Sequence, residues 1–571
     1  MRCCAARLNR HLLKCHKSVM DLTDEFTSYH KHLLVDTYDC VDRIVVHAFY
    51  SLGNNPGGFR NWWRCLTGSD ETLDRTHMER MAGRFNRRLK AYAKKKKIPF
   101  VYCEAGERKH EMAEQYLPSQ AGFKGVFLIL VGRAPAPIWE VDRNSQGQIR
   151  KLYRKKKWPY INHYYFHLID PDWGHVTVRM CGYPPFAAQV MANGHEWVER
   201  QARKQRLPIH KEGNCFTGGN DYQALNRIAK TLCATHTIGR LTRVCDRWLY
   251  SSCLCFALDL AQQERTQFRY QYSIFQLEYS RNLLFQRGRT LDEVYEKLLD
   301  RTRGAFDVKT LKTIFGRKRR PYNRQNRGQE IRLEKVIERP SHNLTVFKLH
   351  FGKLTLKIYD KGDRVLRIEV VAHNAKELRS GKAIDNLPVL LHKMQQHTTD
   401  FLNLVQAAHV SFLDEGAFEA LALPSQRGSK RVAGIDLNKS RMRTVVEALV
   451  ALSPKPGGFT IGDLAHKVQE MAGWRPEDYN PRRAAYDLAK IRGKSIVMRM
   501  SKSRRYSAQP DGIRRLCAYV VLRDKIIKPM MAGASRVQFA SPPRTIHPLD
   551  LHYQKLHQEL LETFQTLGLV A

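Results

Sequence analysis

Strand-like and helix-like segments alternate through the first part of the chain. Gly125–Val131 (GVFLILV) is a continuous apolar run, which is typical of a strand buried on both faces. His77–Lys95 has apolar residues at helical spacing on one side and arginines on the other, which predicts an amphipathic helix. Shorter strands are expected at 42–47 and 98–103. This alternation predicts a mixed α/β domain over residues 20–210, with some parallel strand pairing.

A second mixed region follows a helical connector. Residues 211–268 are interpreted as the connector, because apolar side chains recur at helical spacing from Ile238 to Gln267. Beyond it, three strand-like segments are separated by tight turns at Gly352 and Gly362, which predicts two β-hairpins. We therefore expect an α+β domain with a small, mainly antiparallel sheet over residues 269–408. An exposed basic linker is predicted within it at 317–327.

The pattern in residues 436–533 predicts three helices, a two-stranded hairpin and a further helix. Thr460 is the expected N-cap of the second helix. Asn480 followed by Pro481 is a strong start signal for the third helix, which is expected to end at Gly493. The remaining segments are a basic extension at 1–19 that is expected to be disordered, a linker at 409–435, and a tail at 534–571 with a C-terminal helix.

The charge of the chain narrows its possible partners. There are 96 Lys and Arg against 55 Asp and Glu, a formal net charge of +41 in 571 residues. Such an excess indicates a polyanionic partner, of which nucleic acid is the commonest. A membrane surface is the alternative, but the basic residues are not confined to one amphipathic helix or tail, and no run of eighteen apolar residues exists. We expect a nucleic-acid partner and no membrane.

The distribution of cysteines indicates the cellular compartment in which the protein is expected. Thirteen are scattered through the chain without a C-x-x-C pair, so a zinc ribbon or redox motif is not expected. Most lie in apolar surroundings, as reduced, buried thiols do. The sequence is therefore typical of a cytoplasmic protein.

The order of elements in residues 436–533 resembles the winged-helix regulators of the MarR type. The resemblance implies that the third helix enters the major groove of duplex DNA and that the hairpin contacts phosphates or the minor groove. A protein partner or RNA is the alternative for such a domain. The DNA-binding residues predicted in this domain are Arg482, Arg483, Tyr486, Lys490, Lys494, Lys502, Arg504 and Arg505. In the basic linker they are Arg317, Lys318, Arg319 and Arg320.

Lys357–Val370 (KIYDKGDRVLRIEV) resembles the Tyr-Asp-Lys … Arg-x-Glu stretch near the end of the catalytic domain of phage and plasmid replication initiators. Such initiators nick DNA with a tyrosine and a divalent metal held partly by histidines, and that histidine motif is missing here. Glu278, Asp360 and Glu369 are the candidate catalytic carboxylates, and together they would suit Mg²⁺. The alternative is a purely structural strand, since a strand with charged residues on one face and apolar residues on the other has the same sequence pattern without any catalytic role.

Two further motifs have alternative interpretations. His163 and His167 are candidate metal ligands; the segment around them is predicted as a strand, on which both would share one face. Trp62 and Trp63 lie in a segment, LGNNPGGFRNWWR, that is predicted as a loop because of its Gly and Pro residues, and they would either stack on bases or fill the core. His195 and Glu196, at the start of a predicted helix, are interpreted as a helix opening rather than as a catalytic pair.

Three hypotheses for function follow. The first is a DNA-binding protein, either a transcriptional regulator or a DNA-recognition component of a bacterial replication or mobile-element system. The second is a metal-dependent nuclease or replication initiator that acts on DNA. The third is an RNA-binding protein, since basic linkers and aromatic residues serve RNA as well. Duplex DNA is the expected partner, and a homodimer is a possible assembly.

Overall fold

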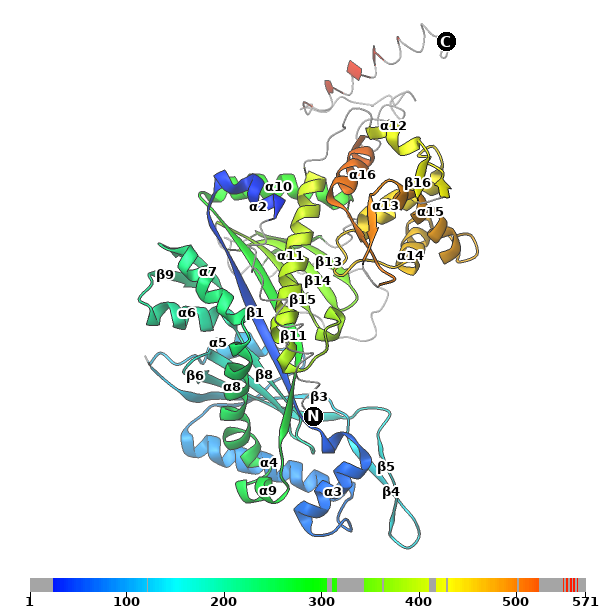
Figure 1. The fold of residues 1–571 in the computed structure, drawn as a ribbon. Helices are drawn as coiled ribbons and strands as arrows, with labels where there is room; N and C mark the ends of the chain where they lie inside the picture. Colours follow the sequence, from blue (N-terminus) through cyan, green and yellow to red (C-terminus); the bar gives the residue numbers. More distant parts are fainter. Residues whose placement is uncertain are drawn as a thin grey trace, which may run out of the picture. The chain divides into compact units, whose positions relative to one another are not determined.

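The computed structural model describes residues 24–120, 122–305, 311–315, 343–361, 364–409, 417–427, 430–500 and 503–522, with isolated positions between 548 and 562 (Figure 1). The described residues form two compact units. The first contains His30–Glu293 and Thr310–Thr398, and the second contains Thr399–Ala571 with the short segments Thr23–Tyr29 and Val294–Lys309. The predicted extension at 1–19, the basic linker at 317–327 and most of the tail at 534–571 lie outside the described residues.

An eleven-stranded mixed sheet organises the described part of the first unit. The strand order is β12-β13-β14-β15-β11-β1-β8-β7-β6-β3-β2. Only β2 and β3 pair in parallel, and every other neighbouring pair in this order is antiparallel. The strands are β1 (Leu34–Tyr50), β2 (Phe100–Tyr102), β3 (Gly125–Pro135), β6 (Tyr160–Asp170), β7 (Gly174–Cys181), β8 (Ala188–Ala192), β11 (Tyr270–Phe285), β12 (Leu311–Phe315), β13 (Asn343–Phe351), β14 (Leu354–Lys361) and β15 (Val365–Ala372).

The mixed α/β character is confirmed, but the prediction of a separate small sheet for residues 269–408 is wrong. The strands of that region continue the sheet of the N-terminal region. The long strand β1 joins them, because it pairs with β11 on one side and with β8 on the other. Local hydrophobic patterns predict the strands themselves and carry no information on which distant strands pair, so the single sheet was missed.

Helices and two small hairpins complete the first unit. Both α6 and α7 pack against β1 (Figure 1). The helices are α3 (Pro56–Thr67), α4 (Arg75–Lys96), α5 (Lys109–Glu114), α6 (Gly194–Lys204), α7 (Tyr222–Lys230), α8 (His236–Ser252) and α9 (Leu260–Arg265). The hairpins are β4 (Trp139–Arg143) with β5 (Ile149–Arg154), and β9 (Ile209–Glu212) with β10 (Cys215–Gly219). Helices α10 (Gly288–Ala305) and α11 (Leu387–His409) contribute residues to both units.

The segment around Trp62 and Trp63 is a helix rather than the predicted loop. The side chain of Asn55 accepts a hydrogen bond from the Gly58 amide, and Pro56 occupies the first turn. This cap and proline start helix α3 despite its two glycines. Each indole is only 1% exposed, so both tryptophans fill the core and the base-stacking interpretation is wrong.

The second unit follows the order of elements predicted for residues 436–533. The predicted caps are confirmed: Thr460 and Asp463 form a capping box, and the Asn480 side chain accepts from the Arg483 amide at 3.1 Å. The described part of the predicted linker at 409–435 contains a short helix and a two-stranded hairpin. The elements are α2 (Glu25–His30), α12 (Ala417–Ala422), β16 (Ser425–Arg427), β17 (Lys430–Val432), α13 (Ser440–Leu452), α14 (Ile461–Ala472), α15 (Pro481–Gly493), β18 (Val497–Arg499), β19 (Tyr506–Ala508) and α16 (Pro510–Leu522).

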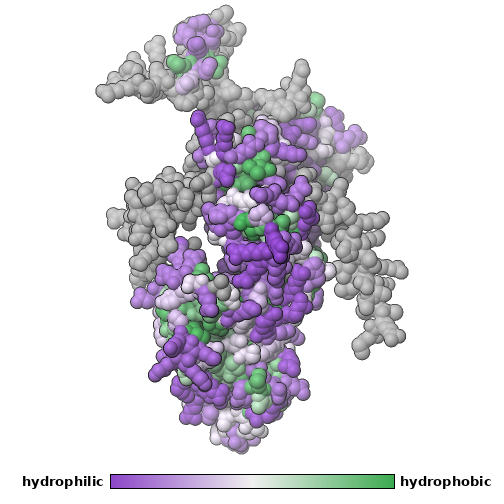
Figure 2. All heavy atoms as spheres, turned by 90° about the vertical axis from the view of Figure 1, so that its left-hand side faces the viewer, coloured by the Kyte–Doolittle hydropathy of each residue, from purple (hydrophilic) through white to green (hydrophobic). Residues whose placement is uncertain are grey.

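One face of the molecule is mainly hydrophilic, as the high content of charged residues suggests (Figure 2). On the face drawn in Figure 2, hydrophilic side chains cover most of the described surface and apolar ones gather only in small patches. Among the helices in the described ranges, none combines the length and the apolar character that a membrane crossing requires.

Candidate functional site

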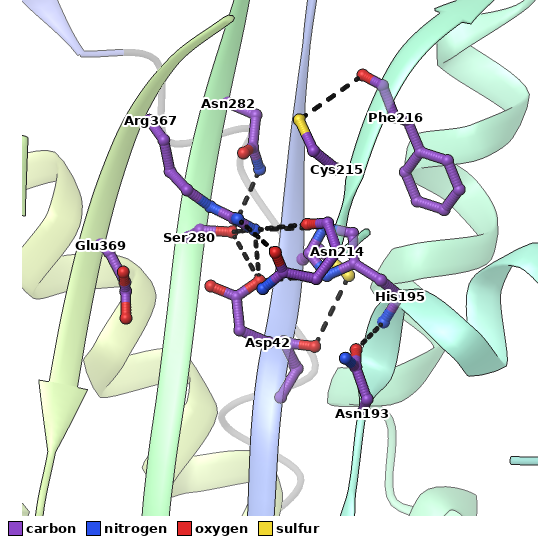
Figure 3. Close-up of polar contacts among 12 residues, drawn as sticks. Asp42, Asn193, His195, Asn214, Cys215, Phe216, Ser280, Asn282, Arg367 and Glu369 are labelled. Atoms are coloured by element: carbon purple, nitrogen blue, oxygen red, sulfur yellow. Dashed lines mark hydrogen bonds and ion pairs between the residues drawn. The ribbon is translucent and has the colours of Figure 1, made fainter. Parts of the chain in front are cut away.

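A network of buried polar side chains lies on one face of the sheet in the first unit (Figure 3). We call Asp42, His195, Asn214, Ser280 and Arg367 the buried charge cluster; Asn214 is half-buried, and the other four side chains are buried. The register between β1 and β11 shifts between Val41 and Arg43, which places Asp42 at an irregularity of strand β1. Irregularities of this kind re-aim side chains and are frequent at functional sites.

Arg367 on β15 is the centre of the buried charge cluster. Its side chain is fully buried, and its Nη2 lies 2.6 Å from Asp42 Oδ1 and 3.0 Å from the Asn214 carbonyl oxygen. Ser280 Oγ on β11 donates to the same Asp42 oxygen at 3.0 Å. Because Asn214 lies in the turn of the β9–β10 hairpin, Arg367 ties that hairpin to the sheet. Removing one partner of a buried ion pair leaves the other charge uncompensated, so loss of either residue alone is expected to destabilise this region.

The charges of the cluster are strongly coupled. Burial alone would raise the pKa of Asp42, but the Arg367 guanidinium and His195 lower it to about 2. Burial lowers the pKa of His195 to about 4, although Asp42 acts in the opposite direction. His195 Nε2 lies 3.3 Å from Arg367 Nη2 and therefore accepts, which leaves the proton of the neutral ring on Nδ1, 3.0 Å from Asp42. At neutral pH the cluster thus holds an ionised Asp42, a neutral His195 and a charged Arg367.

Glu369 and Glu278 lie beside the cluster on the same face of the sheet. Ser280 is the register partner of Glu369, and Glu278 is two residues from Ser280, so the two carboxylates share that face. Glu369 is held by Lys357 Nζ at 2.9 Å and by the Tyr359 hydroxyl at 2.8 Å. Burial raises the pKa of Glu278, and the negative charge of Glu369 adds to that effect.

The predicted three-carboxylate site is wrong with respect to Asp360. Lys357 pairs with Glu369 and Asp360 pairs with Leu366 in an unbroken β14–β15 register. Because side chains alternate between faces, Asp360 faces away from Glu369 and Glu278. The sequence pattern placed all three on one small sheet, but the face of each depends on the register, which only the structure gives.

The histidine pair predicted as metal ligands lies on strand β6, which confirms the strand. His167 Nδ1 is 3.0 Å from His175 Nε2, and His163 Nδ1 is 3.1 Å from the Ile161 carbonyl oxygen. Burial lowers the pKa of His163 to about 4 and that of His167 to about 3. Within the described ranges, no three His, Cys, Asp or Glu side chains are grouped as metal ligands. Both histidines therefore lie among protein partners on the sheet.

The second unit presents a basic surface on helix α15 and the β18–β19 hairpin. Arg482, Arg483 and Tyr486 are exposed on the first turns of α15, and Tyr486 is 58% exposed. Arg483 Nη1 also donates to the Asp478 carbonyl oxygen. Arg504, next to the hairpin, is exposed as well. We call Arg482, Arg483, Tyr486, Arg499 and Arg504 the basic surface.

Three other residues predicted to bind DNA are less accessible. Lys490 is only 9% exposed, with Nζ 4.8 Å from the centroid of the Tyr486 ring, so the exposure that DNA binding would require of it is not found. Arg505 Nη1 donates to the carbonyl oxygens of Gly457 and Gly458, and it holds the turn before α14. Burial lowers the pKa of Lys494, which is half-buried. The predicted residues Lys502, Arg317, Lys318, Arg319 and Arg320 lie outside the described residues.

The only acidic residue within the α15–hairpin segment, residues 480–508, is turned inward. Asp487 is fully buried, with Oδ2 3.2 Å from the Tyr479 hydroxyl and 3.4 Å from Arg441 Nε on helix α13. These contacts fix α15 against α13. They also remove the one negative charge of this segment from its outer side.

The buried charge cluster was not predicted from the sequence. Asp42, His195, Asn214 and Arg367 are separated by up to 325 positions, and their contacts depend on the sheet order. The one available signal was a charged residue within or beside an apolar strand, as at Asp42 and Arg367, since burial of such a residue requires a partner.

The chain was compared with protein-family models, with curated proteins and with solved structures, and none of them matched.

Proposed function

We propose that this protein binds duplex DNA and that residues 436–522 of its second unit act as a winged helix. The observation that carries the proposal is the basic surface on α15 and the hairpin. Its cations project outward, while the acid of the same segment, Asp487, is buried.

The packing of the second unit supports the assignment of α15 as the reading helix. Helix α14 contacts both α13 and α15, and α16 contacts α13. Phe459, just before α14, exchanges backbone hydrogen bonds with Tyr506 of the hairpin at 3.0 and 2.8 Å. The hairpin is thereby attached to the start of α14, as a wing is attached to a helix-turn-helix. In such domains the N-terminal residues of the second helix of the pair reach base edges.

The chemistry of the basic surface suits DNA. An arginine guanidinium can bind O6 and N7 of guanine with two hydrogen bonds, which gives Arg482 and Arg483 a base-reading role. The N-terminus of α15 also favours nearby negative charge. Arg499 and Arg504 on or next to the hairpin are expected to contact phosphates or the minor groove. A transcriptional regulator or a recognition component of a replication or mobile-element system would both use this arrangement.

The proposal is tested by selecting binding sites for the full-length protein from a pool of random DNA duplexes. The affinity for the selected site is then measured at increasing salt concentration. A preferred sequence should emerge, and the affinity should fall steeply as salt rises, because each phosphate contact releases counterions. The same affinity measurement with RNA hairpins distinguishes DNA binding from RNA binding. Tighter binding to RNA, or no preferred duplex, would contradict the proposal.

A further inference from the structure

A basic pocket lies in the first unit, apart from the buried charge cluster. Its volume is about 150 Å³, and its lining includes Lys204, Arg240, Arg243, Arg247, Asp172 and Trp197. Since a cavity of about 10–15 Å³ already holds a water molecule, the pocket has room for a polyatomic anion. The pocket is polar and open to solvent, so a charged ligand can enter it.

Two helices supply the cations at helical spacing. Arg240, Arg243 and Arg247 are three and four residues apart on α8, which places them on one face. Trp197 and Lys204 are seven residues apart on α6 and likewise share one face. The pocket is thus built from two rigid elements, together with the β6–β7 turn that contains Asp172.

The acidic side chains at the pocket neutralise only part of its positive charge. Arg247 Nη1 lies 2.7 Å from Asp170, and its Nη2 lies 3.6 Å from Asp172. Lys204 Nζ lies 3.5 Å from the other oxygen of Asp172. These two acids therefore engage Arg247 and Lys204. Among the residues that the structure describes, no carboxylate lies within ion-pair distance of Arg240 or Arg243.

Arg240 is held in place with an unsatisfied donor. Its guanidinium carbon is 5.1 Å from the centroid of the Trp197 ring. Its Nη1 is buried and has no hydrogen-bond partner. A buried donor without an acceptor is costly, and like charges gathered in a concave site repel one another. An anion in the pocket would relieve both effects.

We propose that this pocket binds a phosphate group, which Arg240 and Arg243 recognise. Phosphate offers several acceptor oxygens and matches the forked geometry of arginine. The group is either a free phosphate or mononucleotide, or a backbone phosphate of a nucleic acid. In the second case the first unit would provide a nucleic-acid contact that is independent of α15.

Phosphate binding by the pocket is tested with two single variants of the full-length protein, Arg240→Gln and Arg243→Gln. The matched control is Arg203→Gln, which removes one positive charge from the exposed side of α6, where Arg203 pairs with Glu199. Arg240→Lys retains the charge, so it distinguishes loss of the fork from loss of charge. Thermal unfolding of every variant shows whether the fold is retained.

Two ligands distinguish the two sources of phosphate. Inorganic phosphate is titrated by calorimetry at low salt, and a labelled 12-nucleotide single strand is titrated by fluorescence anisotropy in an Arg482→Glu/Arg483→Glu background. A loss of affinity of at least about tenfold for inorganic phosphate in both glutamine variants indicates the free ligand. If both glutamine variants lose the same affinity for the oligonucleotide but not for inorganic phosphate, the ligand is a backbone phosphate. The slope of log K against log salt concentration should then also be smaller by about 1. If neither ligand binds, or if both glutamine variants behave like the Arg203→Gln control, the proposal is overturned.

Discussion

The carboxylate of Asp42 lies 2.6 Å from the guanidinium of Arg367, and the two side chains are 3% and 0% exposed. They are 325 positions apart and join β1 to β15, two strands that are separated in the sheet by β11. This ion pair links the N-terminal part of the first unit to the strands predicted for a separate domain. It therefore helps to explain why the two regions fold as one sheet.

Breaking the Asp42–Arg367 pair should destabilise the first unit. Arg367→Gln leaves Asp42 buried without its cation, and we expect a loss of about 3–5 kcal/mol in the free energy of unfolding. Denaturant unfolding followed by fluorescence measures it, with Arg203→Gln as the exposed control. The double variant Asp42→Asn/Arg367→Gln should lose less than the sum of the two single losses. Additive losses would show that the two residues do not interact.

The stability of the first unit should decrease on mild acidification. The folded-state pKa of His195, about 4, lies below its ordinary value of 6.5, so between these values the unfolded chain binds the proton first. The contribution of neutral His195 is therefore fully present above about pH 6.5 and is lost as the pH falls towards 4. His163 and His397, whose pKa values burial also lowers to about 4, act in the same direction.

His195→Gln isolates the part of this dependence that belongs to the cluster. The unfolding free energy of the variant should change less between pH 7 and pH 4 than that of the wild type. At lower pH, Asp42 adds a second loss, because its pKa of about 2 lies below the ordinary 3.8; its contribution is present above 3.8 and disappears as the pH falls towards 2. An identical pH profile for His195→Gln and wild type would exclude a role of His195 in the pH dependence.

Asp487 should affect DNA affinity without affecting sequence preference. Asp487→Asn weakens the contacts with Tyr479 and Arg441 that fix α15, and we expect a loss of about 1–3 kcal/mol in the stability of the second unit. A less firmly held α15 should weaken binding to all duplexes by a similar factor. Asp511→Asn on α16 is the control, since its side chain is 80% exposed. A changed sequence preference in Asp487→Asn would mean that Asp487 takes part in base recognition.

Local signals in the sequence were sufficient for part of this structure. The Asn480 cap, Pro481 and the apolar spacing of α15 all lie within a few residues of one another, and the structure contains that helix as predicted. The continuous apolar run from Gly125 is the buried strand β3. In α3, the glycines and Pro56 favour a turn and led to the prediction of a loop, whereas the structure has a helix that is capped by Asn55.

The remaining features depend on distant residues. The partners of Arg367 come from β1, β11, α6 and the β9–β10 hairpin, and no local pattern brings them together. Whether Asp360 or Lys357 shares a face with Glu369 depends on the strand register. The burial of Lys490 similarly depends on how α15 packs, because its helical position alone suggested exposure.

The most direct test of the account is the sequence preference of an α15 variant. Three full-length proteins are compared: the wild type, the variant Arg482→Glu/Arg483→Glu, and the control Lys439→Glu/Arg515→Glu, whose substituted residues are exposed on the second unit. The two variants reverse the same number of charges. Each is titrated against the selected duplex and an unrelated duplex of the same length. We predict that the α15 variant binds both duplexes equally, while the control keeps the wild-type preference. An unchanged preference in Arg482→Glu/Arg483→Glu would contradict the assignment of α15 as the reader of DNA.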